Sequence, residues 1–146
     1  MIRSAGRRKN LPDGKSLPRG RPWPSPWKPG SVNELLQAKI DVFESGYEFL
    51  LAYAAQGRDS DGGPGSEVRT MLTDMTEAAT EIVHLLEKSD SAYGWVVADD
   101  ARKAQAAIAL VLAQAEIGSE LVDNLNVSIH LRALLTDLFL VSETHP

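Results

Sequence analysis

From about residue 31 to the end of the chain, apolar residues recur three and four positions apart, the repeat of helices that pack around a shared core. The first helix is predicted to begin at the capping box Ser31-Val32-Asn33-Glu34, in which the serine hydroxyl and the glutamate each satisfy a free backbone amide. It is predicted to end at Gly57, where a glycine-rich turn follows. The apolar seam of this helix is Leu36, Ile40, Phe43, Tyr47, Leu50 and Ala54.

The second predicted helix begins after Ser66, a residue type favoured as a helix N-cap. It ends at Ser89-Asp90-Ser91. Its apolar positions keep the same spacing as those of the first helix. They are Val68, Leu72, Met75, Ala79, Ile82 and Leu86.

The third helix is predicted from about Asp99 to Leu125, with residues 92–97 forming a turn or joining its start. Gly118 lies inside it and costs about 1 kcal/mol relative to alanine, so a kink or break is expected there. The fourth helix is predicted from about Asn126. Its apolar positions are Val127, Leu131, Leu134, Leu138 and Val141.

These four segments predict an all-α fold, a four-helix up-down antiparallel bundle over residues 31–146. Short connectors favour antiparallel neighbours, and no segment alternates with the period of two that a half-buried strand requires. At 146 residues the chain has the length of one ordinary domain.

Residues 1–30 have a different composition and are predicted to form an extended, proline-rich basic tail, called the tail below. They hold six of the eight prolines, which lack the amide hydrogen that a helix interior needs. The piece Arg21–Pro29 is expected to be extended, as in polyproline II.

Charge separates the same two regions. The tail carries a net charge of +7, whereas residues 31–146 carry −12. Such asymmetry suggests an anionic partner for the tail. There is no cysteine, so disulfides and thiolate metal sites are excluded. No apolar run approaches the roughly 20 residues of a membrane-spanning helix, and we expect a soluble, cytoplasmic protein without membrane contact.

The tail also supplies the first set of candidate binding residues. Exposed tryptophans held by prolines are typical anchors for a partner, and a preset backbone lowers the cost of ordering. The candidates are Arg19, Arg21, Trp23, Trp27 and Lys28. Three interpretations stay open: the tail binds a protein partner, folds back over an apolar groove of its own acidic bundle, or contacts nucleic acid through its cations and stacking rings.

Apolar residues outside the core seams form a second set. Apolar surface of this extent is rarely left in water, so it predicts a dimer or larger assembly, unless an irregular bundle buries these residues itself. The candidate oligomer-interface residues are Leu35, Val42, Phe49, Tyr53, Leu135, Phe139 and Leu140.

No catalytic, metal or cofactor site is predicted. Glu81 and His84 have the spacing of a di-iron motif, but there is one copy and both fall on an outer face. The loop from Asp59 lacks the glycine and glutamate of a calcium-binding loop. His130 and Asp137 lie two turns apart and are interpreted as boundary polar residues.

The sequence therefore favours a non-enzymatic protein-interaction module: an adaptor, an accessory subunit or a chaperone-like factor. It would dock a partner through the tail or through exposed apolar stripes. The alternative is a nucleic-acid-associated protein that uses the basic tail, although the acidic bundle would repel phosphate.

Overall fold

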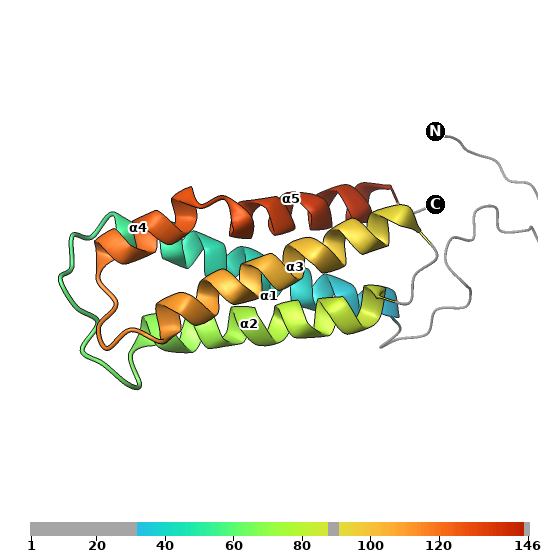
Figure 1. The fold of residues 1–146 in the computed structure, drawn as a ribbon. Helices are drawn as coiled ribbons and strands as arrows, with labels where there is room; N and C mark the ends of the chain where they lie inside the picture. The colour runs from blue at the N-terminus through green and yellow to red at the C-terminus, as the bar shows by residue number, and fades with distance from the viewer. Residues whose placement is uncertain (1–31, 88–90, 145–146) are drawn as a thin grey trace, which may run out of the picture.

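The computed structural model describes residues 32–87 and 91–144, and these form five α-helices and no strand (Figure 1). The all-helical prediction is therefore confirmed for this part of the chain. The number of helices differs from the four predicted. The helices are α1 (Val32–Ala54), α2 (Glu67–Leu86), α3 (Ala92–Leu112), α4 (Ser119–Val127) and α5 (His130–Glu143).

The helices lie side by side in a bundle-like arrangement. In Figure 1, α1, α2 and α3 run in alternating directions along the molecule, and α4 followed by α5 returns along the remaining side. Helix α2 packs against both α1 and α3, and on their other sides α1 packs against α4 and α5, and α3 packs mainly against α5. The start of α3 and the end of α5 therefore lie at the same end of the molecule, near the start of α1 (Figure 1).

The apolar seams of α1 and α2 build much of the core. All six positions predicted for α2, from Val68 to Leu86, are buried. In α1, four of the six predicted positions are buried, while Tyr47 and Ala54 are half-buried. Ser66 caps α2 as predicted, because its hydroxyl oxygen accepts a hydrogen bond from the Arg69 amide at 3.4 Å. The predicted capping box of α1 depends on Ser31, which lies outside the described residues.

The third helix follows one of the two predicted alternatives at its start and ends earlier than predicted. Residues 92–97 join α3, which begins at Ala92 because Ser91 caps it by accepting a hydrogen bond from the Tyr93 amide at 3.1 Å. It ends at Leu112, and a loop separates it from α4. Within that loop Ile117 is fully buried, so its apolar side chain continues the core without continuing the helix.

Gly118 ends this loop where the chain passes against another loop. A Cβ atom there would lie 2.8 Å from the Asp59 carbonyl oxygen, too close for any residue other than glycine without a shift. The Ser119 amide then donates to the Arg58 carbonyl at 2.8 Å. The helical pattern is therefore broken near Gly118, as predicted. At this break the backbones of the 55–66 and 113–118 loops lie in close contact.

A second break separates α4 from α5, where the sequence predicts one helix starting near Asn126. Ile129 has φ of 66°, the left-handed region that β-branched residues rarely adopt. The axes of α4 and α5 differ by 51°. Val127, predicted as a core position, is 67% exposed because the break turns it outward.

Asp61 holds the two loops together. Its carboxylate accepts hydrogen bonds from the Ser66 hydroxyl at 2.6 Å, the Arg69 Nε at 2.7 Å and the Ile117 amide at 2.8 Å. Burial alone would raise the pKa of this carboxyl, but these hydrogen bonds hold it well below its usual value. Asp61 is therefore ionised and bridges the start of α2 to the loop after α3.

Tyr53 and Arg69 complete the contact between these loops. The Tyr53 hydroxyl donates to the Ile117 carbonyl at 2.7 Å, and the Tyr53 carbonyl accepts from the Ser119 hydroxyl at 2.7 Å. Arg69 donates to the carbonyls of Gln114 at 2.7 Å and Ala115 at 3.0 Å. Gln114 and Ala115 lie in the loop after α3, and Arg69 also donates to the Leu112 carbonyl at the end of α3 at 3.2 Å, an oxygen that the helix itself cannot pair.

No single described helix is long and apolar enough to cross a membrane. Helices α4 and α5, bent by 51° relative to each other, have the length and apolar composition of a membrane span only when they are counted together.

Replacing Ile129 by asparagine is expected to stabilise the fold by about 0.5–1 kcal/mol, because asparagine tolerates the left-handed backbone. Ile129 is 57% exposed, so little apolar burial is lost. Urea unfolding measures the change. The control is Val127→Asn, the same kind of substitution on an exposed helical residue, which is expected to give no stabilisation. Equal stability changes in the two variants would contradict the proposed strain at Ile129.

Replacing Asp61 by asparagine is expected to destabilise the fold by about 2–4 kcal/mol. The amide group has one acceptor oxygen in place of two, so one buried donor loses its acceptor, and Arg69 loses its counter-charge. The exposed Asp59→Asn is the control and is expected to change stability by about 0.5 kcal/mol or less. Urea unfolding at pH 7 measures both changes.

The same pair of variants tests the sign of the pH dependence. Because the folded-state pKa of Asp61 is lowered, its contribution is complete above the ordinary value of 3.8 and shrinks as the pH falls below it. The difference between wild type and Asp61→Asn is therefore expected to be smaller at pH 3 than at pH 7. A constant difference would show that ionisation of Asp61 is not what stabilises the contact.

Candidate interaction site

Ten large apolar side chains are exposed on the described surface, and Trp95 is the most exposed of them at 72%. Single exposed apolar residues are normal, but a tryptophan in this position is unusual because of the area it leaves in water. The others are Leu35, Val42, Leu51, Val96, Leu110, Val127, Ile129, Phe139 and Leu140.

The helical repeat of α3 places Trp95 on its outer side. Val97, Ala101 and Ala104 are buried and define the inner face of the helix. Trp95 lies two residues before Val97, which is about 200° around the helix axis. The same residues that build the core therefore direct the indole toward solvent.

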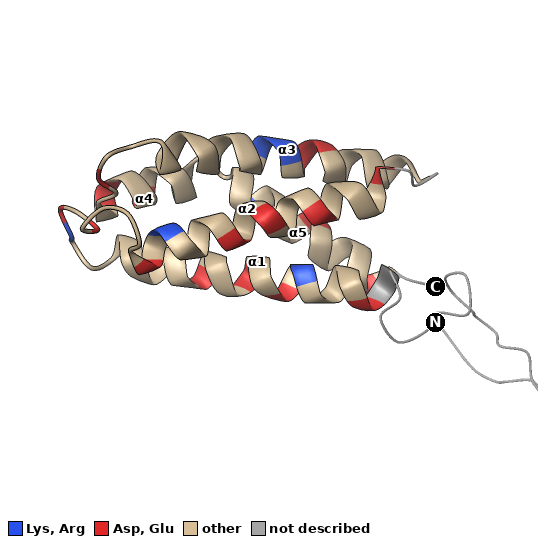
Figure 2. Ribbon diagram, turned by 90° about the horizontal axis from the view of Figure 1, so that it is seen from below, with Lys and Arg blue, Asp and Glu red and all other residues tan. Residues whose placement is uncertain are grey.

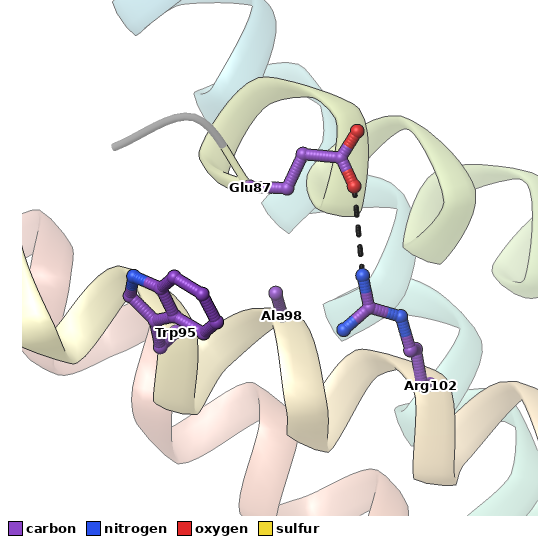
Figure 3. A pocket seen from close by; sticks show the side chains of 4 residues that line it. All are labelled: Glu87, Trp95, Ala98 and Arg102. Carbon is purple, nitrogen blue, oxygen red and sulfur yellow. Dashed lines mark hydrogen bonds and ion pairs between the residues drawn. The ribbon is translucent and has the colours of Figure 1, made fainter. Parts of the chain in front are cut away.

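Trp95 borders a surface recess of about 340 Å³ between the end of α2 and the first half of α3. Its other lining residues are Glu87, Ala98 and Arg102. Figure 3 shows the indole and the guanidinium on the two sides of the Ala98 methyl, with Glu87 reaching over from the end of α2. The recess thus has an aromatic wall, a small apolar floor and an ionic rim.

The ionic rim is a weak contact. The Arg102 Nη2 atom lies 3.5 Å from Glu87 Oε1, and both side chains are well exposed to solvent. Exposed ion pairs of this kind contribute about 0–1 kcal/mol, so either partner can exchange this contact for one to another molecule at little cost. Tryptophan and arginine are also the residues most enriched where protein interfaces derive their affinity. The chemistry of the recess is that of binding an apolar side chain flanked by polar groups.

A smaller recess of about 160 Å³ lies at the opposite end, beside the Asp61 contact. Phe49 and Tyr53 line it, with their rings stacked at a centroid distance of 6.1 Å, and the Arg58 guanidinium lies 5.2 Å from the Tyr53 ring centre. Its polar lining groups are engaged in holding the 55–66 loop. We therefore assign this recess a structural role.

The five tail residues predicted to bind a partner, Arg19, Arg21, Trp23, Trp27 and Lys28, lie outside the described residues. Their role stays a prediction.

The predicted oligomer-interface residues divide into two groups. Leu35, Val42, Phe139 and Leu140 are exposed, as an interface would require, and Phe49 is half-buried. Their contact with another copy of the chain stays a prediction.

Tyr53 and Leu135 are buried within the chain itself, which corrects the expectation that they lie on an exposed stripe. Tyr53 is held inward because its hydroxyl binds the Ile117 carbonyl. Leu135 joins the core because α5 packs against both α1 and α3, so that a broad face of this helix is covered.

Trp95 is absent from the residues predicted from the sequence, because residues 92–97 were open to two interpretations. Two features of the sequence would have placed Trp95 on the outer face of a helix. They are Ser91 as the N-cap and the helical spacing of the apolar residues Val97 and Ala101. Glu81 and His84 are exposed, as expected. Within residues 32–87 and 91–144, no three His, Asp or Glu side chains come together in a way that could hold a metal ion.

Charge adds a second property to the surface. Figure 2 shows acidic residues spaced along α1 and α2. Each of these helices carries four Asp or Glu residues and one Lys or Arg. A basic partner is therefore favoured over an acidic one along this side.

Comparison with known proteins adds nothing to these observations, since the chain matches no family model, no curated protein and no solved structure.

Proposed function

We propose that this protein is a non-enzymatic interaction module, such as an adaptor, an accessory subunit or a chaperone-like factor. It docks a protein partner through exposed apolar surface, with the tail as a second arm. The observation that carries the proposal is Trp95, 72% exposed beside a recess that the rest of the described chain leaves open.

The architecture supports this proposal. We interpret the five helices as a four-helix up-down antiparallel bundle whose last member is divided into α4 and α5. In this interpretation residues 31–146 form a rigid body and residues 1–30 a separate arm. A rigid helical body that presents a preformed recess binds without ordering its own backbone, which lowers the cost of association.

Self-association is a second use of the same kind of surface. The exposed residues Leu35, Val42, Phe139 and Leu140 are the ones that would meet another copy.

Replacing Trp95 by alanine is expected to leave the fold unchanged, since the side chain is largely in water, and to weaken partner binding at least tenfold. Leu110→Ala is the matched control, because Leu110 is 69% exposed on the same helix but away from the recess. Circular dichroism measures folding. Quantitative affinity capture of one partner, identified with the full-length protein, measures binding. Equal capture by wild type and Trp95→Ala would exclude the recess as the docking site.

The alternative function, nucleic-acid association, is favoured by one observation, the net charge of +7 on residues 1–30. Neutralising Arg19, Arg21 and Lys28 together to glutamine in the full-length chain is expected to lower the salt slope of binding by about 2–3, because each phosphate contact contributes roughly 0.7–0.9. The measurement is filter binding of a single-stranded oligonucleotide across a salt series. Absence of binding by the wild type at low salt would reject this alternative.

A further inference from the structure

Asp137 of α5 is buried, with 7% of its surface exposed, and has one hydrogen-bond donor. The Tyr93 hydroxyl, on α3, donates to its Oδ1 at 2.8 Å. The second oxygen, Oδ2, is buried and meets no donor among the described residues. An ionised carboxylate with one unpaired buried oxygen is strongly disfavoured, because its lost hydration is not replaced.

The other polar group at this position is a second acid. The Asp100 carboxyl, one and a half to two turns after Tyr93 on α3, lies within hydrogen-bond reach of Asp137. Two carboxylates can only accept hydrogen bonds, so they repel unless one of them carries a proton. The two cations of α3 have other partners, since Lys103 pairs with Asp99 at 3.4 Å and Arg102 with Glu87 at 3.5 Å.

We propose that the buried Asp137 carries a proton in the folded protein, and that this proton, donated to Asp100, latches α5 onto α3 at the end of the molecule where α3 begins. A protonated Asp137 donates to Asp100 while it accepts from the Tyr93 hydroxyl, so every polar atom of the contact has a partner. Loss of the proton places two negative charges face to face and releases this part of α5 from α3.

The electrostatic surroundings agree with the geometry. Burial, followed by the hydrogen bond and the charge of Asp100, raises the pKa of Asp137 to about 7, against the opposing hydrogen bond from Tyr93. Asp100 and Tyr93, both on α3, are the titratable groups that act on it.

The direction of the pH effect follows from this raised pKa. Between pH 4 and pH 7 the folded protein keeps a proton that the unfolded chain releases. Stability from this contact is therefore present at the lower pH and is lost as the pH rises through about 7. This is opposite to the effect of Asp61, whose contribution is lost in acid.

The test compares urea unfolding of the full-length protein at pH 5 and pH 8. For wild type, the unfolding equilibrium constant is expected to rise by roughly 10- to 100-fold from pH 5 to pH 8 through this pair. Asp137→Asn mimics the protonated acid, because its amide donates to Asp100 and its carbonyl oxygen accepts from Tyr93. This variant is expected to lose the rise and to be more stable than wild type at pH 8.

Two further measurements separate a latch from a general effect. Asp99→Asn, which removes an exposed acid beside Asp100, is expected to keep the wild-type pH profile. Amide hydrogen exchange is expected to accelerate in α5 of the wild type at pH 8, after correction for intrinsic rates, but not in α2. The proposal is overturned if Asp137→Asn keeps the wild-type rise, is less stable than wild type at both pH values, or leaves exchange in α5 unchanged.

Discussion

The structure depends on burying one apolar stripe from each helix around a common core. This requirement decides which residues lie inside. Polar groups are also buried where a helix or loop lies at the boundary of the core. Each such group has to find a partner in the protein, because water cannot reach it. Tyr53, Asp61 and Ser119 meet this requirement at one end of the molecule. At the other end Tyr93 pairs one oxygen of Asp137, and the proposed proton on Asp137 pairs the second with Asp100.

The two buried carboxyls show how the same residue type reaches opposite charge states. Asp61 receives donors from a hydroxyl, a guanidinium and a backbone amide, so ionisation is stabilised despite burial. Asp137 receives a single donor and faces another acid, so the neutral form is favoured. Arg69 makes the difference at the first site, because it supplies charge where the loops meet. The two ends of the bundle therefore respond to pH in opposite directions.

The interaction surface is a consequence of the same packing. With Val97 and Ala101 turned inward, Trp95 has to point outward, and the side chain is left beside a recess with a weak ion pair at its rim. The Asp137 contact joins α5 to this same first half of α3. The proposed docking surface and the proposed proton latch thus share one helix, and the rigidity of its packing supports both.

The sequence alone determined the helical class, the core positions of α2, most of those of α1 and the Ser66 cap, because the apolar repeat is a local property of the chain. It predicted a helix over residues 99–125 with a kink or break at Gly118, because the apolar pattern continues past that glycine to Val122 and Leu125. Tertiary structure decided that a loop over residues 113–118 separates two helices there, and it also decided the strained turn at Ile129 and the burial of Tyr53 and Leu135. It also paired Tyr93 with Asp137 and Tyr53 with Ile117, 44 and 64 positions apart, and no periodicity encodes such contacts because they form only when the helices meet.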